Sequence, residues 1–469
     1  MSTEPPPDPT AAGSAEPPRT VTPAPTPEGT GARPVGADER LVLLDVLRGF
    51  ALGGVFLSNL HVWFSGRIFL PPESMKEAME GPLNVVTGFV FNFFVFGKFI
   101  TIFSFLFGLG FALQTGRAEE RGAPGGRLYA RRLSVMLLLG VAHAVALWYG
   151  DILHVYALFG FTLLLFGRLS GRAILATGLV LALLVSPAVG MLVEFLPRLG
   201  SSPEAIAAAD QAHAEGWSAL QERAVASLTS DSYLALVRAN VDINERMFLR
   251  PAILGSHVGI LGRFLIGAYV GRQRLLHDVA QHRRLFRRLL GWGLVAGVIG
   301  SGVKVALRFL AVAGGQIKPD GMLNQLVHRL SDEIGALGFA AFYVAAIALL
   351  FQRERWRRAL SLLAPAGQMA LTNYLSQSVL GVLIFCGVGL GLMGKVPGPL
   401  NFAIVFVLFS VQIVWSHLWL ARFRFGPAEW LWRSLTYGKA QPMRRAAKGP
   451  EQAARAPELP ASGSASADP

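Results

Sequence analysis

Cysteine and charged residues are scarce in this chain. Cys386 is the one cysteine among 469 residues, which excludes a disulfide framework and a cysteine-based metal site. Only 16% of the residues are charged, whereas soluble domains average about 25%. The sequence contains no P-loop, no HExxH helix and no dinucleotide fingerprint, so it predicts neither ATP-driven transport by this chain alone nor a metal site.

Apolar residues instead make up 52% of the chain and gather in long runs. A helix needs about 20 such residues to cross roughly 30 Å of hydrocarbon. The sequence therefore predicts an all-α, polytopic transmembrane helical bundle with about ten spans. Residues 83–98 are apolar enough to form an interfacial or re-entrant helix before the second span. The predicted spans are 41–61, 99–115, 133–150, 152–168, 173–196, 251–271, 288–312, 334–351, 366–391 and 400–421.

The chain divides into tails, a membrane domain and one long loop. Residues 1–40 are rich in Pro, Ala, Thr and Gly, and the segment 444–469 is similar, so both are predicted to be disordered. The transmembrane helical domain covers 41–421. Its loop at about 197–250 repeats apolar residues at helical spacing, which predicts extramembrane helices. Residues 422–443 follow as a short cytoplasmic segment.

The net charge of +13 comes mainly from arginines, and these lie in alternate loops. The loops 116–132, 272–287 and 352–358 are rich in arginine, whereas 313–333 and 392–399 hold little positive charge. Loops that carry positive charge stay on the cytoplasmic side of a membrane. This pattern predicts that both termini are cytoplasmic and that the loop at 197–250 lies outside. It explains the charge without a nucleic-acid partner.

The first predicted span, LLDVLRGFALGGVFLSNLH, carries polar groups at both ends. Asp45 and Arg48 lie three residues apart near the inner end, where they can pair or meet an anionic ligand. Asn59 returns to nearly the same face about 16 Å further out. Gly49 and Gly53 form a GxxxG pair, which predicts close helix packing.

Three separated segments together resemble the YeiB-like family of bacterial inner-membrane proteins. They are LDVLRGFALGGVFLSN, GVAHAVALWYGDILHVYALFG and FGPAEWLWRSLTYGKAQP, in that order. The resemblance covers nearly all of 41–442. It implies an inner (plasma) membrane location and a multi-pass fold.

A more distant resemblance to membrane acyltransferases rests on the opening D-x-x-R-G of the first span. The type-three O-acyltransferases and the heparan-α-glucosaminide acetyltransferases are similar there. That likeness implies acyl transfer from cytoplasmic acyl-CoA to an acceptor beyond the membrane, with a cell-envelope glycan or lipid as the expected acceptor. The chain departs from the type-three pattern at Asn59, where those enzymes typically have histidine. Asparagine cannot act as a general base, and the glucosaminide acetyltransferases are similar in having asparagine near this point.

A substitute base is therefore sought among the histidines in or near the predicted spans. His143 is the preferred candidate, because an ionisable group in lipid is costly without a use. Asp151 follows eight residues later and can orient the imidazole and raise its basicity. A purely structural hydrogen bond from His143 to a neighbouring helix is an equally good interpretation. The other candidates are His61, His154 and His257.

Further polar groups lie within the predicted spans. Arg263 is near the centre of the sixth, where it can bind a phosphate of CoA or pair with Glu194 or Asp45. A polar cluster in the ninth span is expected to form interhelical hydrogen bonds or to line a ligand site. The members of this cluster that can share a face are Thr372, Asn373 and Gln377.

Two functions are compatible with these residues. In the first, a membrane acyltransferase binds acyl-CoA at Asp45, Arg48 and Arg263, and its catalytic residues are His143, Asp151 and Asn59. In the second, the chain is a transporter or exporter of a small solute or lipid, which intramembrane Arg and His and glycine-interrupted helices favour. The two halves of the chain show no internal similarity, which weakens the second. A non-catalytic membrane relative is a third interpretation, because Asn59 replaces the expected histidine.

Overall fold

The computed structural model describes residues 41–71, 80–120, 125–248, 253–312 and 321–445. Every regular element in these ranges is a helix, apart from one isolated β-bridge, which confirms the all-α prediction over the described residues. The helices are α1 (Val42–Ser58), η1 (Asn59–Phe64), η2 (Arg67–Phe69), α3 (Pro82–Val90), η3 (Phe91–Val95), α4 (Lys98–Glu120), α5 (Gly125–Ala146), α6 (Leu153–Thr162), η4 (Leu163–Phe166), α7 (Gly171–Val180), η5 (Leu181–Val185), α8 (Ser186–Phe195), η6 (Leu196–Arg198), α9 (Pro203–Leu228), α10 (Tyr233–Phe248), α11 (Leu254–Arg272), α12 (Arg283–Val312), α13 (Met322–Phe351), α14 (Glu354–Ser361), α15 (Ala364–Gln368), α16 (Ala370–Phe385), α17 (Gly398–Arg422) and α18 (Pro427–Tyr437).

Among the described residues, eight helical segments are long and apolar enough to cross a membrane. Each overlaps one predicted span, and the shorter apolar helices Leu153–Phe166 and Ala370–Phe385 overlap the other two. Residues 322–333, predicted as part of a loop, instead belong to α13. Residues 83–98 belong to the candidate span Pro82–Glu120, which bends at Gly97, where φ is +80°. The eight segments are Val42–Phe69, Pro82–Glu120, Gly126–Ala146, Gly171–Arg198, Leu254–Arg272, Arg283–Leu307, Met322–Phe351 and Gly398–Arg422.

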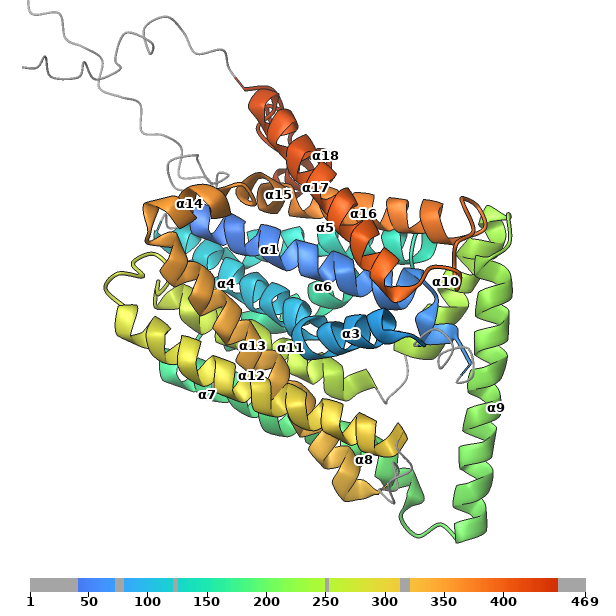
Figure 1. The fold of residues 1–469 in the computed structure, drawn as a ribbon. Coiled ribbons are helices and arrows are strands. Elements are labelled where there is room, and N and C mark those ends of the chain that lie inside the picture. Colours follow the sequence, from blue (N-terminus) through green and yellow to red (C-terminus); the bar gives the residue numbers. More distant parts are fainter. Residues whose placement is uncertain (1–40, 72–79, 121–124, 249–252, 313–320, 446–469) are drawn as a thin grey trace, which may run out of the picture.

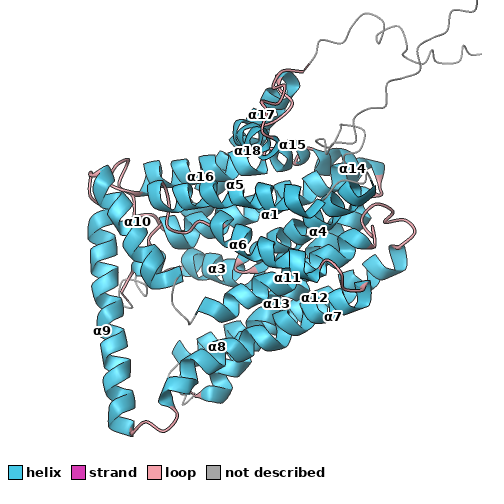
Figure 2. Ribbon diagram, turned by 180° about the vertical axis from the view of Figure 1, so that it is seen from behind, coloured by secondary structure: helices cyan, strands magenta, loops and turns pink. Residues whose placement is uncertain are grey.

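The spanning helices lie side by side, and α9 crosses one end of them at a steep angle (Figures 1 and 2). The helices predicted within the loop at 197–250 are confirmed as α9 and α10. Leu220, Ala224 and Leu228 form the buried stripe of α9, spaced by four residues. The C-terminal half of α9 therefore packs on the membrane bundle.

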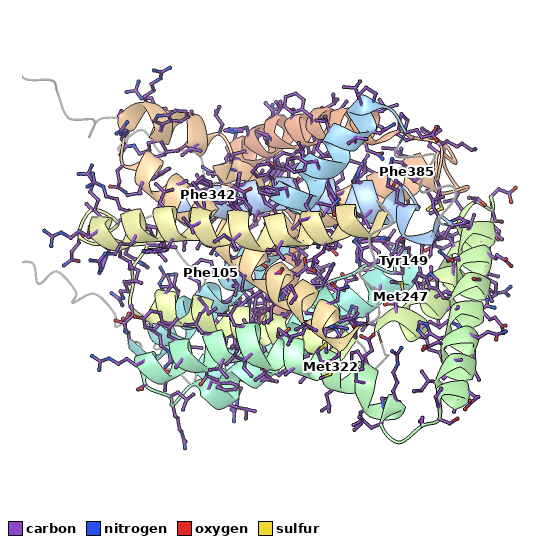
Figure 3. The ribbon with its side chains drawn as sticks, turned by 60° about the horizontal axis from the view of Figure 1, so that its bottom comes forward. Phe105, Tyr149, Met247, Met322, Phe342 and Phe385 are labelled. Atoms are coloured by element: carbon purple, nitrogen blue, oxygen red, sulfur yellow. The ribbon has the colours of Figure 1, made fainter. Side chains whose placement is uncertain are left out.

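Both short apolar helices end beneath α9 and α10. The backbone N–H of Gly387, just after α16, donates to the carbonyl oxygen of Leu228 at 2.9 Å. The backbone N–H of Tyr149, just before α6, donates to Asn240 of α10 at 3.2 Å in the same region. Figure 3 labels Tyr149 and Phe385 at the end of the molecule that α9 covers. These helices can be short because their non-helical ends are buried in protein, where their backbone groups find partners.

The predicted close packing at the GxxxG pair of α1 is confirmed. A Cβ added to Gly49 would lie 2.3 Å from the carbonyl oxygen of Leu363, which is backbone and cannot move aside. A Cβ added to Gly53 would lie 2.7 Å from the ring of Phe409 in α17. Small residues let helices approach where lipid provides no hydrophobic driving force.

The segment after the last span is held against the bundle by α18. The Glu429 side chain accepts hydrogen bonds from the backbone N–H of Leu371 at 2.6 Å and of Thr372 at 3.1 Å, at the start of α16. Arg444 pairs with Phe423 in the isolated bridge, so ordered pairing continues past the predicted start of the C-terminal tail. The rest of that tail, 446–469, and residues 1–40 lie outside the described residues.

Candidate functional site

His143 and Asp151 are in direct contact, as the sequence predicts. His143 lies in the last turn of α5, and Asp151 lies in the turn that leads to α6. The distance from His143 Nδ1 to Asp151 Oδ1 is 2.8 Å. His143 is 4% exposed and Asp151 is fully buried. The α5–α6 turn brings together two groups that are eight residues apart in the chain.

Asp151 also binds His154, another of the candidate histidines. Its Oδ2 accepts from the His154 backbone N–H at 2.9 Å and lies 2.8 Å from His154 Nδ1. Burial opposes ionisation of Asp151, but hydrogen bonds from His143 and His154 outweigh it and hold its pKa below the usual value. An ionised carboxylate only accepts hydrogen bonds, so Nδ1 of both imidazoles carries the proton. Nε2 of His143 is then the basic nitrogen.

This basic nitrogen has no hydrogen-bond partner among the described residues, although it is buried. The Tyr374 ring lies 5.3 Å from the imidazole and the Trp148 ring 6.3 Å from it, both between centroids. A buried polar atom left without a partner costs about 1–3 kcal/mol. That cost is expected where the atom meets a ligand during function. In the described part of the chain, no three His, Cys, Asp or Glu side chains are arranged to hold a metal ion.

Side chains of α10 hold the α5–α6 turn, a contribution that sequence reasoning missed. Asn240 accepts from the Tyr149 backbone N–H at 3.2 Å and donates to the carbonyl oxygen of Val145 at 3.1 Å. The Tyr233 hydroxyl donates to the carbonyl oxygen of Ala146 at 2.8 Å. The last carbonyls of a helix lack partners within it, and α10 supplies them here. Helix α10 therefore positions the turn that carries Asp151 and the end of α5 that carries His143.

A group of arginines from α1, α5 and α18 lies near the opposite end of α5. Arg48 donates to Asp45 at 2.9 Å, which confirms the predicted pairing on one face of α1. Arg132 of α5 stacks over the Trp432 ring at 4.0 Å, and Trp432 donates to the Arg132 carbonyl oxygen at 3.0 Å. Positive charges on Arg48 and Arg433 repel Arg132, so these three groups lie near one another. Such a concentration of arginines suits an anionic ligand.

The structure does not bring every predicted residue into this arrangement. Asn59 begins the π-helical segment η1, is half-buried and makes no side-chain hydrogen bond to the residues that the structure describes. His257 lies on α11 and packs on the Phe159 ring, 5.3 Å away between centroids. His61 is buried against the ring of Phe91, at 4.5 Å. Neither histidine contacts Asp151.

Arg263 is paired, but not with the partners that the sequence suggested. Its guanidinium donates to Glu333 of α13 at 2.6 Å, so the expectation of Glu194 or Asp45 is wrong. Glu194 instead accepts from Arg329 at 2.9 Å. The reason is geometric: Glu333 and Arg329 are four residues apart, so one face of α13 meets both α11 and α8.

These pairs belong to a row of ion pairs along α13, which the sequence did not reveal. We call this row the charged ladder; its members on α13 are Arg329, Asp332 and Glu333. Besides the pairs of Arg263 and Arg329, Lys304 of α12 forms an ion pair with Asp332, at 2.5 Å between Nζ and Oδ1. Ser186 of α8 donates to Glu333 at 3.3 Å. The pattern that could have revealed the ladder is the spacing of Arg329, Asp332 and Glu333 on one helix, which places all of them within about one turn.

The polar cluster of α16 forms interhelical hydrogen bonds, as predicted. Asn373 donates to Ser416 of α17 at 2.9 Å, and Gln377 donates to Gln412 of the same helix at 2.9 Å. Thr372 donates to Glu429 of α18 at 2.5 Å. This cluster therefore joins α16 to the last two helices of the described chain.

Apolar spanning helices with a buried polar site define a polytopic α-helical integral membrane protein. The chain belongs to the YeiB-like family, and its residues 270–439 match the family model described as "Protein of unknown function (DUF418)". It is 33% identical to "Uncharacterized protein YxaH" of Bacillus subtilis (strain 168), over 89% of this chain and 99% of that protein. It is 30% identical to "Uncharacterized protein YeiB" of Escherichia coli (strain K12), over 86% of this chain and 98% of that protein. No solved structure matches the chain.

Proposed function

We propose that this protein transfers an acyl group from cytoplasmic acyl-CoA to an acceptor at the outer face of the inner membrane. The observation that carries the proposal is the buried His143–Asp151 pair, in which the carboxylate orients the imidazole and leaves Nε2 free. A histidine held in this way is the usual general base for attack by a hydroxyl or an amine.

The reaction follows from the position of the free nitrogen. His143 Nε2 takes the proton from the acceptor hydroxyl or amine as the acceptor atom attacks the thioester carbonyl carbon. The carbon–sulfur bond then breaks, and the departing thiolate takes up the proton from the imidazolium. The products are an ester or amide and free CoA. Asp151 stabilises the imidazolium during the step and stays ionised.

The donor would enter from the side of the arginines. Arg132 and His143 are eleven residues apart on α5, which corresponds to about 16 Å along the helix axis. Arg48, held by Asp45, and Arg132 would bind the phosphates of CoA, and the extended pantetheine arm would carry the thioester toward His143. Arg263 pairs with Glu333 and is a weaker candidate for this role. A cell-envelope glycan or lipid would be the acceptor.

The proposal is tested with the purified full chain in nanodiscs, acetyl-CoA and a mixture of envelope glycans and lipids. We expect His143→Gln to lower acetyl transfer at least about 100-fold, because general-base catalysis contributes this much or more. The matched control is His213→Gln, an exposed histidine on α9, which should leave transfer unchanged. Full transfer by the His143 variant would refute the role of this residue.

Binding of the donor is measured separately. Arg48→Gln should weaken acetyl-CoA binding by about tenfold, since it removes one charge-assisted hydrogen-bonding group. The exposed Arg358 serves as the control, in the variant Arg358→Gln. Equal affinities of the wild type and of Arg48→Gln for acetyl-CoA would show that the donor does not bind at Arg48.

The charged ladder favours transport as a second candidate function. Charged side chains within membrane spans often mark ion or proton pathways.

The test of transport uses proteoliposomes with an entrapped pH-sensitive dye and an imposed potassium diffusion potential. Transport predicts proton movement in the wild type that Glu333→Gln abolishes. If the ladder is only structural, the wild type shows no movement and the double variant Arg263→Leu/Glu333→Leu is as stable as the wild type, because both charges are gone.

A further inference from the structure

The first turn of α17 packs against His61 and Arg67 where the outer end of the first span approaches it. His61 lies in η1, is 6% exposed, and its Nδ1 has no hydrogen-bond partner among the described residues. The Phe402 ring of α17 lies 5.4 Å from the His61 ring between centroids. A Cβ added to Gly398, the first residue of α17, would lie 3.6 Å from His61 Cε1. The imidazole therefore packs against the first turn of α17.

Asn401 lies on the same side of that first turn. It is fully buried, and neither its amide nitrogen nor its amide oxygen has a partner within the described ranges. It is three residues after Gly398 and one before Phe402, both of which approach His61. Side chains on a helix lean toward its N-terminus, so the Asn401 side chain starts toward the first turn of α17, where Gly398 and Phe402 lie beside His61. Leaving an amide unpaired inside a protein is costly, so a partner is expected here.

Arg67 adds a positive charge to this group. Its guanidinium donates to the carbonyl oxygens of Val396 at 3.3 Å and His61 at 3.5 Å and to the Ser65 hydroxyl at 3.5 Å, and all three contacts are long. Its charge acts on the His61 imidazole. Among the described residues Arg67 has no acidic partner, in contrast to the paired Arg263 and Arg329. The half-buried guanidinium therefore keeps hydrogen-bonding capacity for an anion.

We propose that Arg67, Asn401 and His61 bind a small oxyanion, a phosphate or carboxylate group, at the outer end of α1 and α17. The guanidinium supplies the attraction for negative charge, and the positive end of the α17 dipole adds to it. The Asn401 amide supplies a neutral donor. A water molecule would satisfy the amide, but it would leave the half-buried charge of Arg67 without a counter-ion among the residues that the structure describes.

The oxyanion could belong to a free solute or to a lipid headgroup. The neighbouring helix α3 carries exposed apolar residues, including Leu83, Val85 and Val86, which are suited to lipid contact. Asn84 on the same helix accepts from the Gly398 backbone N–H at 3.1 Å, which joins α3 to the site. A lipid lying against α3 could therefore place its phosphate beside Arg67. The inference does not depend on acyl transfer.

The test measures thermal unfolding of the full chain in a nonionic detergent, with inorganic phosphate or dioleoyl phosphatidate titrated at constant ionic strength. We expect at least one probe to raise the unfolding temperature of the wild type. Arg67→Gln should weaken the half-saturation concentration of that probe about tenfold. Asn401→Leu keeps the approximate volume of the side chain. It should raise the unfolding temperature without ligand, because an unpaired amide is removed, and should abolish the stabilisation by the probe.

The matched control is Lys395→Gln, which removes an exposed charge close to the site but not part of it. This variant should respond to the probe as the wild type does. Tighter binding of phosphatidate than of phosphate would assign the site to a lipid headgroup, and equal binding would assign it to a free oxyanion. If neither probe stabilises the wild type, or if stabilisation persists in both Arg67→Gln and Asn401→Leu, the proposed site does not exist.

Discussion

The Asp151 carboxylate accepts hydrogen bonds from several groups and not from His143 alone. Its two oxygens contact His143, His154 and the His154 backbone N–H, and the Tyr374 hydroxyl lies 3.5 Å from Oδ1. All of these groups donate toward the carboxylate. The arrangement holds one imidazole tautomer in place, and it leaves Nε2 of His143 as the one basic atom of that ring.

Replacing Asp151 with asparagine tests whether the carboxylate orients the His143 imidazole, because the substitution leaves the volume of the side chain nearly unchanged. Asp151→Asn keeps the volume, but it loses the negative charge and one acceptor oxygen, so one buried donor is left without a partner. We expect a loss of about 1–3 kcal/mol in stability, seen as a lower unfolding temperature. Acyl transfer should fall at least as far as in His143→Gln. An Asp151→Asn variant with normal transfer would show that the carboxylate does not orient the base.

Helix α10 illustrates how an extramembrane element positions groups inside the membrane domain. Tyr233 and Asn240 lie on one face of α10 and contact the last carbonyls of α5. The sequence predicts helices in the loop at 197–250, from apolar spacing that falls within α9. It does not predict the contact, because Asn240 and Tyr149 are 91 residues apart in the chain.

Removal of the Asn240 side chain should therefore loosen the α5–α6 turn. In Asn240→Leu, the Tyr149 N–H and the Val145 carbonyl lose their partner, which should cost about 1–3 kcal/mol. Hydrogen exchange of residues 147–152 should become faster, while exchange within α12 and α13 stays unchanged. Glu245→Gln, on the exposed side of α10, is the control and should behave as the wild type. Unchanged exchange in Asn240→Leu would contradict the role given to α10.

The contact between α18 and α16 should be sensitive to pH. Burial raises the pKa of Glu429 above its ordinary value, although hydrogen bonds from Thr372 and Leu371 act in the opposite direction. The folded state then binds a proton more tightly than the unfolded state. Stability from this group is fully present below the unfolded pKa of about 4.5 and is lost as pH rises through the folded pKa.

The unfolding temperature of Glu429→Gln isolates this effect. The difference in stability between wild type and variant should fall as pH is raised above about 4.5, because the variant carries no titrating group at this position. The measurement is a series of thermal unfolding curves across that range at constant ionic strength. A difference that is constant with pH would show that the carboxyl of Glu429 has the same pKa in both states.

For the molecule as a whole, the arginine-rich loops set the expected orientation in the membrane. The loop at 116–132 should face the cytoplasm, and α9 should face the outside. Single cysteines placed at Glu119 and at Gln211 test this, in a Cys386→Ser background. The native Cys386 is buried, so its replacement removes background labelling. A membrane-impermeant maleimide added to intact cells should label position 211 and leave position 119 unlabelled. The reverse pattern would invert the orientation.

Segment positions and short-range contacts could be derived from the order of residues alone. Long hydrophobic runs locate the spans, since a helix needs about 20 apolar residues to cross the hydrocarbon layer. Asp45 and Arg48 pair because three residues are close to one helical turn. His143 and Asp151 meet across a short turn. These features follow from the helical period and from local chain geometry.

Contacts between distant helices were decided only by the packed structure. Arg263 binds Glu333, which is 70 residues away in the chain, and not Glu194 or Asp45. Glu429 binds Thr372, which is 57 residues away. A span that is apolar on all sides carries little signal for which of its faces meets which neighbour, because lipid and protein are equally apolar. The partners of Arg263, Asn240 and Glu429 depend on that choice of faces, which is settled by tertiary packing.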